Sequence, residues 1–114
     1  RKLFIDFLLM KAGWNLNDKN MFEYEVEGLK STSSGKGNID YVLWGDSAYP
    51  LAIIEAKKAS YNAKKGEFQA LEYAEALERK FNFFPIRFVT NGFEIFIYEN
   101  KNSIPRRIYG FYRK

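Results

Sequence analysis

The chain has 114 residues, of which 46% are hydrophobic and 18% aromatic, enough apolar surface for one domain with a single core. It contains no Cys and no His, which excludes disulfides, thiolate or imidazole metal sites and His-dependent catalytic triads. The net charge of +4 is uneven: residues 101–114 carry +5 and no acid, which leaves −1 for residues 1–100.

Residues 1–14 are expected to form the first helix, because apolar side chains recur there at helical spacing and Gly13 follows as a stop. The predicted apolar face of this helix consists of Leu3, Phe4, Phe7, Leu8 and either Met10 or Lys11. Residues 23–29 (EYEVEGL) alternate acidic with apolar side chains, which predicts a half-exposed strand. Residues 31–37 (STSSGKG) have the composition of a loop.

Two further strands are expected over residues 38–44 and 51–56, which are apolar runs rich in β-branched and aromatic side chains. Gly45-Asp46-Ser47 and Pro50 lie between them, so the two runs should form an antiparallel hairpin.

The second helix is expected over residues 66–81, and Pro85 prevents its continuation. Its predicted apolar stripe consists of Phe68, Leu71, Ala74, Leu77 and Phe81. Residues 86–90 and 93–98 then predict two strands joined at Asn91-Gly92. A long helix between the third and fourth strands indicates a crossover, and therefore an α/β or α+β fold with a mixed sheet.

Two charged residues, Glu55 and Lys57, lie at the end of the apolar run from 51 to 57, where alternation places them on the same face of the strand. If the hairpin closes symmetrically about residues 47 and 48, residue 44 faces 51 and Asp40 faces Glu55. The Cβ atoms of this acidic pair would then be about 5 Å apart.

Two facing carboxylates repel each other unless a cation lies between them. Mg²⁺ is bound in proteins by one or two carboxylates together with waters and phosphate oxygens, so Asp40 and Glu55 are candidate metal ligands. Phosphodiester hydrolysis needs such a metal, and an adjacent Lys57 can position the attacking water and stabilise the charge that develops on phosphate. The alternative is an exposed strand end on which Asp40 only forms a salt bridge with Lys57.

Residues 37–43 (GNIDYVL) and 50–58 (PLAIIEAKK) resemble the motif of the PD-(D/E)XK nuclease superfamily. Residues 69–74 (QALEYA) are similar to the QxxxY element of type I restriction enzyme R (restriction) subunits. Residues 12–14 (AGW) and 88–92 (FVTNG) also look like the N-terminal domain of that subunit, so the resemblance covers nearly the whole chain.

The resemblance implies that Asp40 and Glu55 are metal ligands, that Lys57 is the catalytic lysine, and that Gln69 and Tyr73 are accessory site residues. It also implies a restriction-endonuclease-like αβββαβ core, in which helices flank a mixed sheet. Without the resemblance, Gln69 and Tyr73 would be interpreted as a solvated side chain and a half-buried core-edge tyrosine.

The chain departs from the family pattern in two places. Position 39 is Ile instead of the Pro of the superfamily's name, which is a common variation. The family often has a further Glu upstream on the first helix, where this chain offers Asp6, to which we assign no role. Three more lysines flank the proposed site and are candidates for DNA phosphate contacts: Lys58, Lys64 and Lys65.

The sequence therefore predicts a single nuclease domain over residues 1–114, part of a longer chain, with a basic tail over residues 101–114. We expect Mg²⁺, or Mn²⁺ as a substitute, as its cofactor and double-stranded DNA as its partner. The resemblance implies helicase motor domains in the same full-length chain, separate modification and specificity subunits, and ATP as a cofactor of that assembly alone. It also implies a cytoplasmic location in a prokaryote, and the sequence contains no membrane span or signal peptide.

Two other interpretations remain open. One is a non-catalytic DNA-binding module on the same fold. The other is a soluble interaction domain whose basic tail docks a partner.

Overall fold

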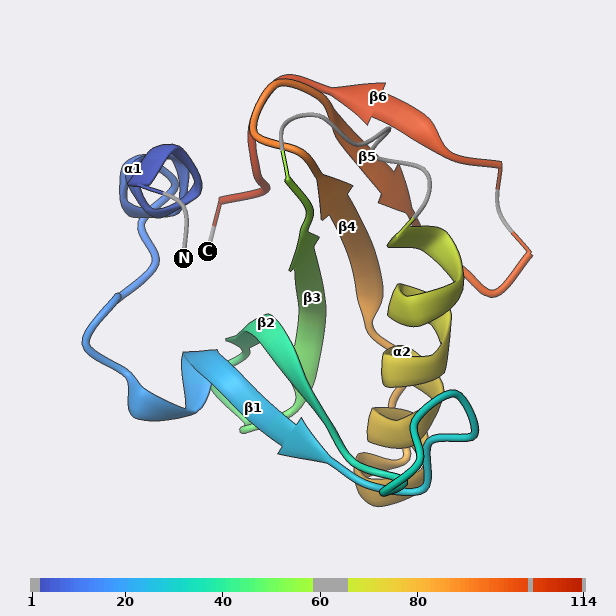
Figure 1. The fold of residues 1–114 in the computed structure, drawn as a ribbon. Coiled ribbons are helices and arrows are strands. Elements are labelled where there is room, and N and C mark those ends of the chain that lie inside the picture. The colour runs from blue at the N-terminus through green and yellow to red at the C-terminus, as the bar shows by residue number, and fades with distance from the viewer. Residues whose placement is uncertain (1–2, 59–65, 103, 114) are drawn as a thin grey trace.

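A mixed six-stranded sheet with a helix packed on each face makes up the fold (Figure 1). The computed structural model describes residues 3–58, 66–102 and 104–113. The described elements are α1 (Leu3–Lys11), the 3-10 helix η1 (Lys19–Met21), β1 (Phe22–Val26), β2 (Gly37–Trp44), β3 (Pro50–Ala56), α2 (Glu67–Phe81), β4 (Ile86–Thr90), β5 (Ile95–Tyr98) and β6 (Arg106–Ile108).

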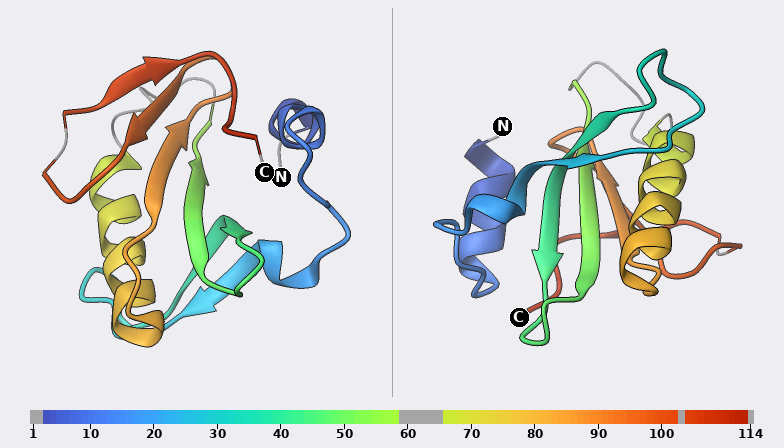
Figure 2. Two further views of the ribbon diagram at one scale, coloured as in Figure 1. Left: turned by 180° about the vertical axis from the view of Figure 1, so that it is seen from behind. Right: turned by 90° about the horizontal axis from the view of Figure 1, so that it is seen from below.

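The strands occupy the sheet in the order in which they occur in the chain. β3 and β4 are parallel, and the other neighbouring pairs are antiparallel. Helix α2 lies between the two parallel strands in the chain and forms the crossover, which confirms the predicted mixed sheet (Figure 2). The class is α+β.

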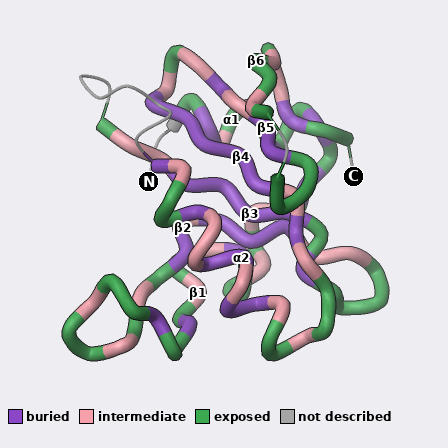
Figure 3. Tube along the Cα trace, turned by 90° about the vertical axis from the view of Figure 1, so that its right-hand side faces the viewer, coloured by how far each residue is buried: buried purple, intermediate pink, exposed green. Residues whose placement is uncertain are grey.

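The buried residues form two clusters, one on each face of the sheet. The cluster under α1 includes Ile5, Leu9, Tyr41, Ile54 and Phe88. The cluster under α2 includes Val42, Ile53, Tyr73, Leu77 and Val89. The central strands are therefore buried over most of their length, as Figure 3 shows.

The predicted apolar face of α1 is wrong. The helix buries Ile5, Leu9 and, just beyond its end, Ala12, whereas Phe4, Phe7 and Met10 are 50–59% exposed. Of the predicted face, Leu8 is partly buried, Lys11 is exposed, and the side chain of Leu3 lies outside the described residues. Almost every side chain of α1 is apolar, so spacing alone does not select one face. Neither α1 nor any other described helix is long and apolar enough to cross a membrane.

The predicted stripe of α2 is also partly wrong. Phe68 is 82% exposed, and the helix instead packs through Ala70, Tyr73, Ala74, Ala76 and Leu77. Small side chains on this face let the helix lie close to the sheet, which a row of phenylalanines would not. Ala74 and Leu77 are thus buried as predicted, while Leu71 and Phe81 are partly buried.

The hairpin between β2 and β3 forms as predicted, with Tyr41 opposite Ile54 and Leu43 opposite Ala52. The predicted pairing of residue 44 with residue 51 is wrong, because the register shifts after Leu43 and Trp44 pairs with Pro50. This irregularity lies at the turn end of the hairpin. It leaves unchanged the register that brings residue 40 opposite residue 55.

Two strand boundaries differ slightly from the predicted ones. The first strand ends at Val26 instead of residue 29, and the strand expected from residue 93 starts at Ile95. Asn91 Oδ1 accepts hydrogen bonds from the amides of Phe93 and Glu94, at 2.9 and 2.8 Å. These bonds extend the turn between β4 and β5 beyond the predicted Asn91-Gly92 dipeptide.

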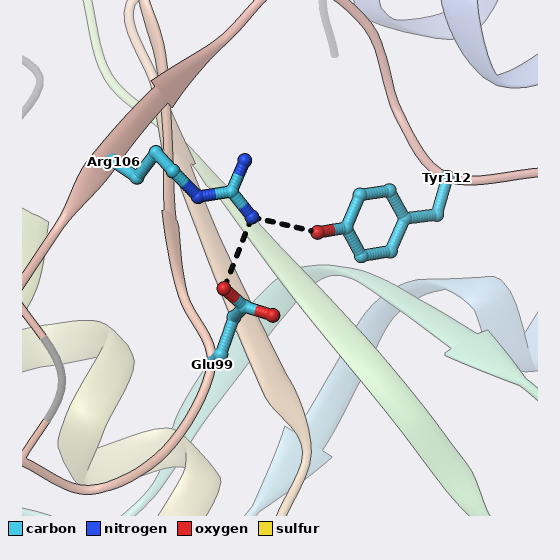
Figure 4. Close-up of polar contacts among 3 residues, drawn as sticks. All are labelled: Glu99, Arg106 and Tyr112. Atoms are coloured by element: carbon cyan, nitrogen blue, oxygen red, sulfur yellow. Dashed lines mark hydrogen bonds and ion pairs between the residues drawn. The ribbon is translucent and has the colours of Figure 1, made fainter.

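Strand β6 was not predicted, and it lies within the basic tail of residues 101–114. It pairs with β5 at the edge of the sheet, where charged side chains are typical. Arg106 Nη2 lies 3.0 Å from Glu99 Oε1 and 3.1 Å from Tyr112 Oη (Figure 4). Trp14 Nε1 donates to the carbonyl oxygen of Tyr112 at 3.0 Å. Arg106, Phe111 and Tyr112 therefore attach the tail to the domain, whereas Tyr109 is 85% exposed.

Candidate active site

Asp40 and Glu55 meet where β2 and β3 pair. The pairing of Tyr41 with Ile54 places Asp40 opposite Glu55, on the face that α2 covers. The amide of Ala56 donates to Asp40 Oδ2 at 2.8 Å, and the amide of Asp40 lies 3.5 Å from Glu55 Oε2. The expected acidic pair is therefore present in the structure.

The surroundings of Glu55 disfavour the ionised form of its carboxyl group. The residue is 2% exposed. Burial, followed by the charge of Asp40, raises the pKa of Glu55 from 4.5 to about 9, and Lys57 acts in the opposite direction. In the absence of a bound cation, Glu55 therefore carries a proton at neutral pH.

Lys57 lies immediately beyond β3 and on the same face as Glu55. Its amide donates to the carbonyl oxygen of Thr90 at 2.8 Å, which extends the pairing of β3 with β4. Its Nζ donates to Gln69 Oε1. In the described part of the chain no ion pair joins Lys57 to Asp40, so the simple salt bridge expected under the alternative interpretation is not formed.

Helix α2 contributes Gln69 and Tyr73, which lie one turn apart. Gln69 Nε2 donates to Tyr73 Oη at 3.2 Å, so a chain of hydrogen bonds runs from Lys57 through Gln69 to Tyr73. Burial, and after it the charge of Glu55, raises the pKa of Tyr73 to about 12. Tyr73 is 5% exposed and belongs to the core, whereas Gln69 is exposed.

Two glycines permit the close approaches that build this site. A Cβ added at Gly66, just before α2, would lie 2.8 Å from Val89 Cγ1 and 3.0 Å from Lys57 Cε. A Cβ added at Gly37, the first residue of β2, would lie 2.7 Å from Leu29 Cδ1 and 2.9 Å from Tyr73 Oη. A larger residue at Gly66 would therefore displace the side chain of Lys57.

The other residues singled out in the sequence are Lys58, Lys64, Lys65 and Asp6. Lys58 is exposed beside Lys57, whereas Lys64 and Lys65 lie outside the described residues. Asp6 accepts a hydrogen bond from Tyr41 Oη at 2.7 Å, on the opposite face of the sheet. Asp6 therefore fixes α1 to the sheet and lies away from the acidic pair.

Sequence reasoning missed Glu72. Its carboxylate accepts hydrogen bonds from the amides of Lys30 and Ser31, at 2.7 and 3.1 Å, and from Ser31 Oγ. A glutamate on an amphipathic helix usually faces solvent, so the sequence contained no signal for this contact.

The donor set fits a hard divalent cation. Two carboxylates converge, and water and phosphate oxygens can complete the shell of an ion such as Mg²⁺. Among the described residues no group of three Asp or Glu side chains gathers to hold a metal, so the protein itself would supply two carboxylates. An all-oxygen site of this kind favours Mg²⁺ or Mn²⁺ over Zn²⁺.

Comparison with known proteins gives a consistent result. Residues 22–106 match the family described as the type I restriction enzyme R protein N terminus. The type I restriction enzyme EcoAI endonuclease subunit of Escherichia coli is 32% identical over 91 residues, which cover 74% of this chain. These residues cover 11% of that relative, so the chain spans a small part of its length.

The fold also matches a solved structure, the fragment of a putative HsdR subunit of a type I restriction enzyme from Vibrio vulnificus YJ016. The TM-score is 0.68 at 22% sequence identity, with 96% of this chain and 22% of that chain covered. The family match, the curated relative and the shared fold agree. The chain belongs to the family of N-terminal domains of type I restriction enzyme R proteins.

Proposed function

We propose that this domain is a Mg²⁺-dependent DNA endonuclease whose reaction centre consists of Asp40, Glu55 and Lys57. The observation that carries the proposal is the buried carboxylate of Glu55, which faces Asp40 and has Lys57 on the same side of the strand. A buried acid with a strongly raised pKa beside a second acid is typical of functional sites.

In this proposal Asp40 and Glu55 hold the cation. A bound Mg²⁺ or Mn²⁺ ion would stabilise negative charge on the phosphoryl oxygens and lower the pKa of a water molecule. Glu55 must lose its proton to act as a ligand, because a protonated carboxyl is a poor ligand for a hard cation.

Lys57 provides a second positive charge beside the acidic pair. Its Nζ can orient the attacking water and stabilise the negative charge that develops on the phosphate. Gln69 accepts a hydrogen bond from this Nζ, and Tyr73 holds Gln69, so both act as positioning residues for the lysine.

The partners of the domain follow from its family. We propose double-stranded DNA as the substrate, without sequence readout by this domain. Helicase motor domains in the full-length chain, together with modification and specificity subunits, would direct cleavage. ATP would serve that assembly and not this domain, because residues 1–114 contain no Walker motif.

The test compares cleavage of duplex DNA by the wild type with three variants: Asp40→Asn, Glu55→Gln and Lys57→Ala. Each variant should lower the cleavage rate by about 10²-fold or more, because each removes a group that acts on the transition state. Glu27→Gln, an exposed acid on the segment after β1, is the matched control and should cleave as the wild type does.

Metal binding gives a second readout, since it can be followed without cleavage. Mg²⁺ should raise the melting temperature of the wild type and of Glu27→Gln, but not that of Asp40→Asn. Cleavage that persists in excess EDTA, or that Zn²⁺ supports best, would contradict the proposal. DNA binding without any Mg²⁺ response would favour the non-catalytic module.

A further inference from the structure

The loop between β1 and β2 presents positive charge and hydroxyl groups to solvent. We call residues 30–36 the serine loop. Its exposed residues are Lys30, Ser31, Ser33, Ser34 and Lys36. It contains two lysines and no acid, so its outer surface has the composition of a phosphate contact.

Glu72 of α2 fixes this loop in place. Its carboxylate accepts from the amides of Lys30 and Ser31 and from Ser31 Oγ, so three donors of the loop converge on one side chain. The hydrogen bond from Ser31 Oγ is the main reason that the pKa of Glu72 lies below its ordinary value. The loop is also closed on itself by the amide of Leu29, which donates to the carbonyl oxygen of Gly35 at 2.9 Å.

The serine loop leads directly into the candidate site. Gly37 follows it and packs on Tyr73 Oη, and Asp40 comes three residues later on β2. Three residues of strand span about 10 Å, so the end of the loop lies about three nucleotides along the duplex axis from the acidic pair. Gln69, Glu72 and Tyr73 belong to neighbouring turns of α2, and Figure 2 shows the loop beside this helix.

Acidic side chains lie beside the loop, and Lys30 lines a pocket together with Glu72, Glu75 and Glu78. Glu72 faces the loop backbone. Glu25 and Glu27 line a second pocket, of about 430 Å³, together with Arg79 and Lys80. Lys36 is exposed and lines neither of these two pockets, so it remains available to a phosphate backbone.

We propose that the serine loop binds the DNA backbone on one side of the scissile phosphate, through Lys30, Lys36 and the hydroxyl groups of Ser33 and Ser34, and that Glu72 is its positioning residue. The position of the loop relative to a scissile phosphate rests on the proposed nuclease function. The contact with duplex DNA does not, because backbone binding requires no cleavage.

The experiment measures binding of a fluorescent DNA duplex in EDTA over a range of salt concentrations, with Lys30→Ala/Lys36→Ala as the test variant. Loss of two phosphate contacts should lower the slope of log affinity against log salt by about 1.8. Lys11→Ala/Lys19→Ala is the matched control, since both lysines are exposed on α1 and η1, outside the serine loop. Its slope should equal that of the wild type.

Glu72→Ala tests the positioning role. It should remove the hydrogen-exchange protection of the Lys30 and Ser31 amides and weaken DNA binding several-fold. The Mg²⁺-induced rise in melting temperature should remain, because Asp40 and Glu55 are unchanged. Wild-type protection of these amides in Glu72→Ala would overturn the role of Glu72.

The outcomes separate the two proposals. If the test variant keeps the wild-type salt slope while the wild type cleaves DNA, the serine loop proposal is wrong and the nuclease proposal stands. If the slope of the test variant is lower by about 1.8 while the wild type neither binds Mg²⁺ nor cleaves, the loop binds DNA and the nuclease proposal fails.

Discussion

Two buried ionisable side chains lie on the same face of the sheet, in adjacent strands, and their surroundings differ. Glu55 at the end of β3 and Arg87 at the start of β4 are each 2% exposed. The guanidinium of Arg87 lies over the rings of Phe84 and Tyr98, at 5.4 and 5.2 Å, and donates to the carbonyl oxygen of Asn100. The fold thus gives Arg87 three groups that attract a cation, although its buried Nε has no hydrogen-bond partner among the described residues and burial lowers the pKa of Arg87.

Glu55 instead faces a second carboxylate. Burial and the charge of Asp40 both oppose its ionisation, and Lys57 offsets them only in part. The difference distinguishes a structural charge from a functional one: Arg87 receives its partners from the fold, whereas an ionised Glu55 would need a partner from outside.

The largest expected effect on stability is at Arg87. Arg87→Ala removes the contacts with both rings and leaves the carbonyl of Asn100 without this donor, so it should lower the free energy of unfolding by about 3 kcal/mol. Urea denaturation measures this. Arg107→Ala on the exposed edge strand is the control and should change it by less than about 0.5 kcal/mol. Equal effects of the two substitutions would show that the contacts of Arg87 with Phe84, Tyr98 and Asn100 do not stabilise the fold.

The pH dependence of stability tests Glu55. Its pKa is about 9 in the folded protein against an ordinary value of 4.5, so between these values the folded state binds more protons than the unfolded state. The stability contributed by this group is fully present below pH 4.5 and is lost as the pH rises through 9. Glu55→Gln should remove this loss, because the amide does not titrate.

Urea midpoints in EDTA at about pH 5, 7 and 9 measure the effect, with Glu27→Gln as a matched control that should follow the wild type. The comparison of Glu55 with Arg87 breaks down if wild-type stability rises over this range, or if Glu55→Gln has the wild-type pH dependence.

The smallest expected effect is that of Asp40→Asn on the metal-free protein. The side-chain amide oxygen of this variant can still accept from the backbone N–H of Ala56, and a Glu55 that is protonated at neutral pH does not repel Asp40 in the wild type. The free energy of unfolding in EDTA should therefore stay within about 1 kcal/mol of the wild-type value, the scale of a cross-strand pair. Thermal melts in EDTA and in Mg²⁺ measure this. A less stable variant that responds to Mg²⁺ as the wild type does would make Asp40 structural.

The acidic pair could be predicted from sequence because a strand alternates its faces and a short turn fixes the register. Asp40 and Glu55 therefore come together even though the pairing shifts near Trp44. That Gln69 belongs to the site was suggested by family resemblance alone, since nothing local relates the end of a strand at Lys57 to a helix residue twelve positions later. Glu72 gave no signal, because its partners lie 41 and 42 residues away.

The sequence by itself determined the order of the main elements, the hairpin that carries Asp40 and Glu55, and the oxygen-only chemistry of a chain without Cys or His. These features depend on periodicity, turn residues and composition, which are local. Tertiary structure alone decided which faces of α1 and α2 are buried, the addition of β6 to the sheet, and the enclosure of Arg87. A nearly all-apolar helix such as α1 is compatible with several faces, and only the shape of the sheet beneath it selects Ile5 and Leu9.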